Sequence, residues 1–228
     1  MSFYIVPTPI GNLEDITLRA IRILKECDLI LCEDTRETRK LLNHYEIKTA
    51  TQSYHAQSKL SRIDDIIKDL EDGKNIALVS DAGTPAISDP GSLLISKIRE
   101  ALPEQKIESL PGPSALTAAF AASGVLGGEF TFLGFLPHKK GRETLFKEIA
   151  ASDRPSVFYE SPHRILKTLE SLKKFAPEKR VVVAKEISKI YEEYITGTAE
   201  VILEYFAKNP DKTRGEFVVI VGEGRKVV

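Results

Sequence analysis

Two adjacent carboxylates, Glu33 and Asp34, follow a short apolar segment at residues 29–32. Carboxylates at the end of a strand could accept a proton or anchor a ligand. Asp34 also stands three residues before Glu37, which is the spacing of a helix capping box with Asp in the usual Ser or Thr place. The spacing favours a cap for Asp34 and explains Glu33 less well. His163 is a third candidate, because imidazole accepts protons near neutral pH, although a polar rim residue would look the same.

The segment at residues 80–91, SDAGTPAISDPG, is the most informative loop of the sequence. Its small residues would let the backbone approach a ligand closely, and its prolines would stiffen the chain. Asp81, Thr84 and Ser88 add hydrogen-bonding groups. An ordinary surface loop would tolerate Lys and Glu, and this stretch has neither. The composition therefore indicates a shaped pocket.

Three other segments have two interpretations each. Residues 7–12, PTPIGN, stand where a dinucleotide-binding fold has its glycine-rich loop, but they cannot form that phosphate-cradling turn. They are either a ligand loop or a stiff connector. Residues 111–115, PGPSA, are compatible with a helix cap or a pocket wall. Residues 137–142, PHKKGR, are either an anion contact or solvated surface.

Each of these candidate segments is expected to begin where a β-strand ends. Short apolar runs predict strands at residues 3–6, 29–32, 76–79, 106–110, 130–133, 156–159, 180–184 and 217–221. Helical patterns lie between them, and repeated βα units predict an α/β protein with mostly parallel sheets. In such sheets ligands bind beyond the carboxyl ends of the strands. The Pro-Gly-Pro sequence that starts at residue 111 predicts a boundary between lobes at residues 1–112 and 113–228.

Composition limits the partners and the compartment. The chain has 228 residues, of which 42% are hydrophobic and 29% charged, and this is typical of a globular protein. A net charge of −1 provides no global basic field, so any RNA contact must be local. Cys27 and Cys32 match neither a disulfide framework nor a metal pair, which predicts a reducing cytoplasm. No apolar run is long enough for a signal peptide or a membrane span.

Taken in order, the loops resemble the motifs of the tetrapyrrole-methylase superfamily, the class III S-adenosylmethionine-dependent methyltransferases. The resemblance covers residues 3 to 222 and rests on residues 7–20, 80–91 and 111–115. The sequences PTPIGNL, EDTR, SDAGTP and ESPHR resemble the ribosomal RNA branch. Corrin and porphyrin enzymes usually have G-D-P where this chain has Gly83-Thr84-Pro85, and Thr84 is typical of the RNA branch.

The resemblance implies two α/β lobes with S-adenosylmethionine in the cleft between them, usually in a homodimer and without a metal. It implies 2′-O-methylation of a cytidine in the decoding region of 16S ribosomal RNA, in the small ribosomal subunit. By motif position it implies cofactor contacts from Pro9, Asp81, Gly83, Thr84, Pro85, Ile87, Ser114, Ala115, Tyr159 and Glu160. Asp34, Glu33 and His163 are, in that order, the candidates for a general base.

Two locally basic groups would have to hold the RNA backbone. They are Arg36, Arg39 and Lys40 after the second predicted strand, and Lys139, Lys140 and Arg142 in the second lobe. Two alternatives stay open: a C-methylase acting on a tetrapyrrole, and a noncatalytic S-adenosylmethionine-binding assembly factor. The missing G-D-P and the basic loop disfavour the first, and the retained pocket loop disfavours the second. Relatives often carry a further helical domain, so either the protein lacks one or the sequence is part of a longer one.

Overall fold

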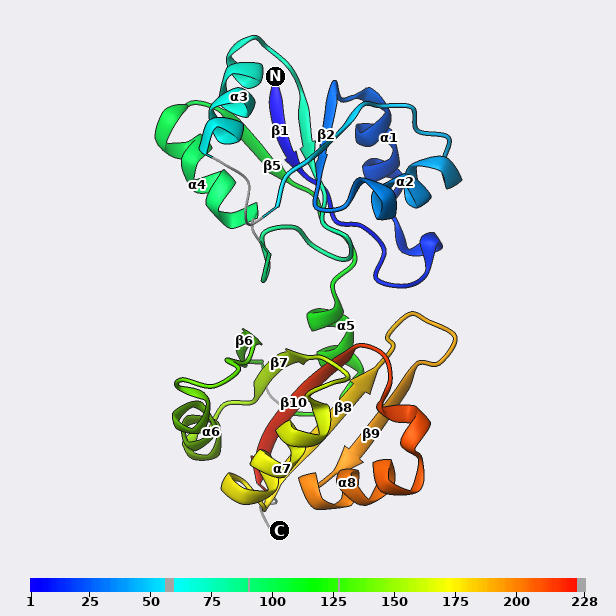
Figure 1. Ribbon diagram of the computed structural model, residues 1–228, viewed down its shortest axis with the longest axis vertical. Coiled ribbons are helices and arrows are strands. Elements are labelled where there is room, and N and C mark those ends of the chain that lie inside the picture. The colour runs from blue at the N-terminus through cyan, green and yellow to red at the C-terminus, as the bar shows by residue number, and fades with distance from the viewer. Residues whose placement is uncertain (56–59, 90, 127, 225–228) are drawn as a thin grey trace. The chain divides into compact units, whose positions relative to one another are not determined.

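The computed structural model describes residues 1–55, 60–89, 91–126 and 128–224 (Figure 1). The chain divides into two compact units, Met1–Ser114 and Ala115–Val228, which we call the first and the second lobe. Each lobe is built on a five-stranded sheet that carries helices. Among the described residues, no helix is long and apolar enough to cross a membrane.

The first sheet is entirely parallel, which confirms the prediction for this lobe. Its strand order is β3-β2-β4-β1-β5. The strands are β1 (Ser2–Ile5), β2 (Leu29–Cys32), β3 (Thr51–Ser53), β4 (Ile76–Leu78) and β5 (Lys106–Ser109). The helices are α1 (Leu18–Glu26), α2 (Thr35–His44), α3 (Leu60–Glu71) and α4 (Gly91–Ala101), with a 3-10 turn η1 (Leu13–Asp15) before α1.

Helices cover both faces of this sheet (Figure 1). Helices α1 and α2 pack on the face that includes Ala77, whereas α3 and α4 pack on the face that includes Ile76 and Leu78. Because both faces are buried, β4 appears in the sequence as an uninterrupted apolar run. Since all five strands are parallel, the segments that follow β1, β2, β4 and β5 all leave from the same edge.

The second sheet has the strand order β6-β7-β10-β8-β9. Its strands are β6 (Thr131–Phe135), β7 (Ser156–Glu160), β8 (Lys179–Lys185), β9 (Glu193–Gly197) and β10 (Phe217–Gly224). Its helices are α5 (Ala115–Ala122), α6 (Arg142–Ala151), α7 (Ile165–Phe175) and α8 (Ala199–Lys208), followed by a 3-10 turn η2 (Pro210–Thr213). Helices α6, α7 and α8 share one core with the sheet, and α5 contacts β7 and β10.

The expectation of a mostly parallel sheet is wrong for the second lobe. Only β6 and β7 pair in parallel, and the other three pairs are antiparallel. The connection between β8 and β9, residues 186–192, is shorter than the dozen or so residues that a parallel crossover needs. It is a hairpin loop with Glu186 and Ser188 at φ 51° and 67°. Strand β9, with the sequence EYITG, was not predicted.

Candidate functional site

The loops at the carboxyl edge of the first sheet are tied to one another. Thr8 and Gly83 exchange two backbone hydrogen bonds of 2.9 Å. The Thr8 hydroxyl also donates to the carbonyl of Ser80 at 3.0 Å. The Thr84 hydroxyl donates to the carbonyl of Pro113 at 3.1 Å. The segments after β1, β4 and β5, all expected to contact a cofactor, therefore form one connected unit.

Close backbone packing explains the glycines in these loops. Gly83 has φ 80°, in the left-handed region that favours glycine, and a Cβ there would lie 3.4 Å from Ile10. A Cβ on Gly112 would lie 2.7 Å from the Cβ of Pro7, a distance that neighbouring side chains do not tolerate. Around them Pro9 is half-buried and Pro85 is buried. The result is a closely packed unit of loops without long side chains.

The loop between β4 and α4 holds unusual backbone conformations. Ala86 and Ser88 have φ 68° and 66°, which costs free energy for residues with a side chain. Asp89 stabilises this shape, because its Oδ1 accepts hydrogen bonds of 2.8 Å from the backbone N–H groups of Ala86 and Gly91. Ile87 lies between the two strained residues and is 46% exposed. A predicted cofactor residue is thus held outward on a stiff loop, although Pro90 lies outside the described residues.

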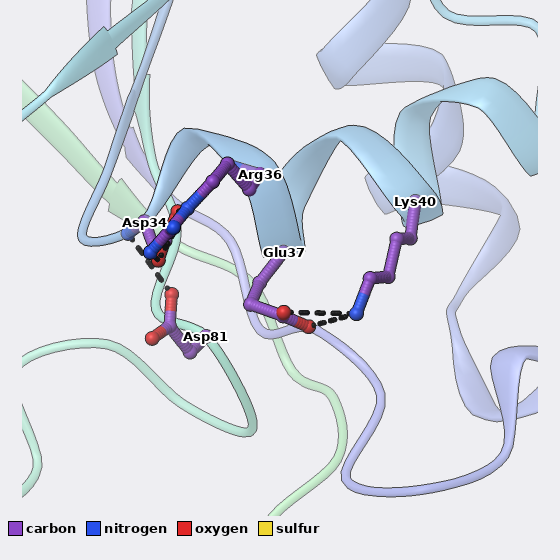
Figure 2. Close-up of polar contacts among 5 residues, drawn as sticks. All are labelled: Asp34, Arg36, Glu37, Lys40 and Asp81. Carbon is purple, nitrogen blue, oxygen red and sulfur yellow. Dashed lines mark hydrogen bonds and ion pairs between the residues drawn. The ribbon is translucent and has the colours of Figure 1, made fainter.

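Asp34 is the N-cap of α2, as its spacing predicted (Figure 2). Its carboxylate accepts a 2.8 Å hydrogen bond from the backbone of Arg36 and pairs with the guanidinium of the same residue at 2.6 Å. Glu37 does not complete a capping box, because its carboxylate binds Lys40. The backbone N–H of Asp34 instead donates to Asp81 at 3.1 Å, so it links the loops after β2 and β4.

The two neighbouring carboxylates have opposite pKa shifts. Hydrogen bonds from Arg36 lower the pKa of Asp34 to about 2. Burial raises the pKa of Glu33, and the negative charges of Asp81 and Asp89 raise it further. A carboxylate with so low a pKa accepts protons poorly at neutral pH, whereas a raised pKa improves a general base. By these pKa shifts Glu33 is the better proton acceptor of the two, whereas Asp34 stood first in our expected order.

The chemistry of this edge suits a cationic ligand. Glu33, Asp81 and Asp89 act on one another electrostatically at the ends of two neighbouring strands. S-adenosylmethionine carries a sulfonium and an ammonium group, and nearby carboxylates stabilise such charges. The residues of the first lobe thus fit the cofactor that the resemblance implies.

Three further candidates lie at the end of the first lobe and in the second lobe: Ser114, Ala115 and Tyr159. Ser114 ends the first lobe, and Ala115 is the first residue of α5; both are half-buried. Tyr159 in β7 makes a hydrogen bond with the backbone of Leu116. Burial raises the pKa of this phenol still further above neutral pH.

The side chain of Glu160 binds other groups of the protein. Its carboxylate is fully buried and accepts hydrogen bonds from the Ser161 backbone at 2.9 Å and from the Thr168 hydroxyl at 2.5 Å. The guanidinium of Arg164 lies 2.9 Å from one carboxylate oxygen, and that of Arg142 lies 3.9 Å from the other. Because protein groups occupy the carboxylate, Glu160 fits a structural role better than a direct contact of its side chain with a cofactor.

Arg142 does not belong to the exposed basic group in which we expected it. It is 8% exposed, and it donates to the Thr168 hydroxyl at 2.6 Å and to the Pro137 carbonyl at 3.2 Å. A phosphate could reach this guanidinium only by displacing those partners. The expectation that Arg142 binds RNA is therefore abandoned, and Lys139 and Lys140, which are exposed, remain.

The other predicted residues are at the surface. Arg39 is exposed, and Arg36 and Lys40 are exposed while paired with Asp34 and Glu37. His163 is exposed in the turn before α7, which begins at Ile165. Arg164 and Thr168 were missed as structural groups, because the sequence gives no sign that they meet a buried carboxylate.

Comparison with known proteins places the chain in a family. The family model described as Tetrapyrrole (Corrin/Porphyrin) Methylases matches residues 2–202. The Ribosomal RNA small subunit methyltransferase I of Hydrogenobaculum sp. is 46% identical over 98% of this chain and 96% of that protein. The Thermotoga maritima protein of the same name is 44% identical over 95% and 96%. The one from Halalkalibacterium halodurans is 45% identical over 99% of this chain and 78% of its own length.

Solved structures agree on the fold. Diphthine synthase superposes with a TM-score of 0.74 at 13% identity, covering 97% of this chain and 90% of that one. The methyltransferase CobJ superposes with a TM-score of 0.71 at 22% identity, covering 100% and 97%. A uroporphyrin-III C-methyl transferase from Thermus thermophilus, complexed with S-adenyl homocysteine, has a TM-score of 0.66 at 18% identity and 98% coverage of both chains. The chain is a methyltransferase that belongs to the tetrapyrrole methylase family, in its branch of ribosomal RNA small subunit methyltransferase I proteins.

Proposed function

We propose that this protein uses S-adenosylmethionine to methylate the ribose 2′-oxygen of a cytidine in the decoding region of 16S ribosomal RNA, within the small ribosomal subunit. One observation carries the proposal. The rigid loop after β4, which carries Asp81 and Asp89, lies at the carboxyl edge of a parallel sheet. The chain is also 44–46% identical to proteins named for the ribosomal RNA of the small subunit. We further propose that the protein acts as a homodimer in the cytoplasm.

Positioning supplies most of the catalysis in this proposal. The cofactor provides a methyl group already activated by its sulfonium, so the protein need only hold and orient the reactants. Orientation is worth about 7–11 kcal/mol, whereas a general base adds about 10²–10⁴-fold in rate. In the first lobe, the loop around Gly83 and Thr84, with Pro9, Pro85, Ile87 and Ser114, would hold the cofactor. Asp81 would stabilise its positive charge.

Glu33 is the proton acceptor that the electrostatics favour. Because its folded-state pKa is raised, ionised Glu33 destabilises the fold. This penalty begins as the pH rises above the unfolded pKa of about 4.3 and is complete above the folded pKa. Glu33→Gln should therefore raise the melting temperature at pH 7 and leave it unchanged near pH 3. The same variant should lower kcat by about 100-fold, the lower end of general base effects.

Asp34→Asn is the matched control for that variant. Asparagine caps helices as well as aspartate does, but it loses the ion pair with Arg36. The lowered pKa of Asp34 means that its charge stabilises the fold above the unfolded pKa and stops doing so as pH falls toward about 2. Asp34→Asn should thus not raise the melting temperature, and kcat should change less than with Glu33→Gln. Equal losses of kcat in both variants would remove Glu33 from its proposed role.

The proposed function is tested by offering the protein alternative acceptors for the methyl group. Purified protein and methyl-labelled S-adenosylmethionine are incubated with small ribosomal subunits, with naked 16S ribosomal RNA or with uroporphyrinogen. We expect label in the 2′-O-methyl of a cytidine in the subunit, with less in naked RNA, because a small contact patch needs a preformed surface. Label in the macrocycle alone would show a tetrapyrrole methylase, and label in neither would leave a noncatalytic binding protein.

The RNA backbone contact is tested by salt dependence. Lys139 and Lys140 are exposed in a protein of net charge −1, so they provide local rather than global attraction. Reversing both to glutamate should weaken subunit binding and reduce the slope of log affinity against log salt by about two. Lys167→Glu with Lys208→Glu is the control, since it reverses two exposed lysines on α7 and α8 of the same lobe. Equal slopes in the two double variants would show that residues 139 and 140 are only solvated surface.

A further inference from the structure

An aromatic side chain is exposed directly before the basic loop of the second lobe. Phe135 ends strand β6 and is 57% exposed, whereas the next residue, Leu136, is 1% exposed and lies in the core. Single exposed apolar side chains are common at protein surfaces, so it is the positioning of this ring that sets it apart. Strand β6 is at the edge of its sheet, and its pairing explains how the exposed ring is placed.

A bulge turns Phe135 toward Tyr159. Phe132 pairs with Val157, and regular alternation would bring Gly134 opposite Tyr159. The register shifts instead, so that Phe135 stands opposite Tyr159, while Gly134 adopts φ 60°. The extra residue brings two rings of β6 beside the tyrosine, with centroid distances of 5.1 Å for Phe132 and 5.5 Å for Phe135. Bulges at sheet edges commonly redirect a side chain in this way.

The ring behind Phe135 is itself fixed. Tyr159 is half-buried, and its phenol makes a hydrogen bond with the backbone of Leu116 in α5. The Phe135 ring is tilted by 60° against it. An aromatic ring supported on one side and exposed on the other loses little conformational entropy when a flat ligand stacks on it. The arrangement is a preorganised platform for a planar group.

The chain that leaves Phe135 is also held in place. Arg164 donates to the carbonyl of Leu136 at 2.7 Å, and Arg142 donates to that of Pro137 at 3.2 Å. Both guanidiniums lie against the buried carboxylate of Glu160. The exposed lysines at 139 and 140 follow within four or five residues, which span at most about 14–18 Å when extended. A fixed ring and two cations are thus presented on one short segment.

We propose that Phe135 stacks on an unpaired base of the substrate RNA while Lys139 and Lys140 contact phosphates of the same strand. The inference rests on the proposed function and adds the element that grips a nucleotide. Proteins that bind unpaired RNA combine aromatic platforms with positive charge, because every base has a flat face and every linkage is anionic. Phe135 is therefore a positioning residue for the substrate and lies outside the set of cofactor contacts proposed above.

The absence of tryptophan from the chain permits a direct test. Phe135→Trp introduces the single tryptophan of the protein at the platform, and stacking of a base should quench its fluorescence. Leu126→Trp is the matched control, because Leu126 is 88% exposed in the same lobe and outside the platform. A single-stranded RNA carrying the cytidine region is titrated into both variants. Quenching in Phe135→Trp alone supports stacking, and equal quenching, or none at saturating RNA, overturns it.

Kinetics with small subunits provide the second readout. Phe135→Leu keeps apolar area but removes the ring, and it should raise KM for the subunit about tenfold, within the range measured for a lost base stack. Phe135→Trp should keep KM near the wild-type value, and cofactor affinity by calorimetry should stay unchanged in both. If Phe135→Leu has the same KM for the subunit as Phe135→Trp, the residue docks as an apolar group and does not stack. If cofactor binding is weakened, Phe135 belongs to the cofactor site. Either result overturns the inference.

The two proposals fail in different ways. If wild-type protein does not methylate subunits, the proposed function is wrong, whatever Phe135 does. If methylation is normal in Phe135→Leu and the tryptophan is not quenched, the platform is wrong while the methyltransferase proposal stands. If subunit binding depends on the ring but no methylation occurs, the platform stands and the proposed reaction is wrong.

Discussion

Replacing Glu160 by glutamine should destabilise the second lobe by about 3–5 kcal/mol, the range for breaking a buried ion pair by removing one partner. The carboxylate of Glu160 is fully buried between two arginines, Arg142 and Arg164, whose side chains are 10% and 15% exposed. A neutral amide of the same shape leaves both cations without a counter-charge in a poorly solvated place. The loss should be large although no apolar contact changes.

Chemical denaturation of the full chain measures this effect, followed by a signal from the second lobe. Glu143→Gln is the control, because it makes the same substitution in the exposed pair with Lys147, whose side chains are 64% and 63% exposed. That pair should contribute less than about 1 kcal/mol. If the two variants unfold at the same denaturant concentration, Glu160 does not hold the lobe together. The loop before α6 should also lose order, since both arginines bind its carbonyls.

The first lobe could be predicted well because its sequence signals are local. Strand β2 was predicted with the bounds that the structure shows, and β4 within one residue. Both are buried on two faces, so their apolar runs are continuous and end abruptly at polar residues. The short edge strand β3 was missed, because the sequence TQS has no apolar pattern. It forms only by pairing with β2.

The second lobe was predicted less well because its signals depend on distant partners. The antiparallel arrangement follows from the short turn between β8 and β9 and from where β10 enters the sheet. No local sequence pattern predicts the position of β10 in the sheet. Arg142 looked like a member of a basic loop, and only the fold shows that it turns inward to Thr168.

The positions of the two neighbouring carboxylates could be predicted from the sequence, but their electrostatics could not. Sequence placed Glu33 and Asp34 at the end of a strand and recognised the helix cap. The order of their pKa values depends on Arg36 and on Asp81, which reaches them from another loop. Such electrostatic coupling requires three-dimensional neighbours. The sequence could therefore restrict the candidates for a proton acceptor to a few residues, and the pKa shifts that favour Glu33 required the structure.

Replacing Thr84 by arginine should weaken binding of S-adenosylmethionine by about 100-fold or more. Thr84 is half-buried, and its hydroxyl joins the loop after β4 to the carbonyl of Pro113. Arginine adds a long side chain to loops of small residues, and it would place a positive charge beside the proposed cationic cofactor. Like charges held together cost several kcal/mol, and each 1.4 kcal/mol is about tenfold in affinity. The expected loss of cofactor affinity combines a steric effect with charge repulsion. Two milder variants separate these causes.

Thr84→Val keeps the shape of the side chain but loses the hydrogen bond to Pro113, and should weaken binding less than tenfold, since one neutral hydrogen bond is worth about 1 kcal/mol. Thr84→Gln adds length without charge and should fall between valine and arginine. Asn43→Arg is the control for charge, because it adds the same cation at an exposed position of α2. Calorimetry with the cofactor gives the affinities, and melting temperature verifies the fold. An arginine variant that binds as tightly as Asn43→Arg would move the cofactor away from this loop, and with it the assignment of Gly83, Pro85 and Ile87.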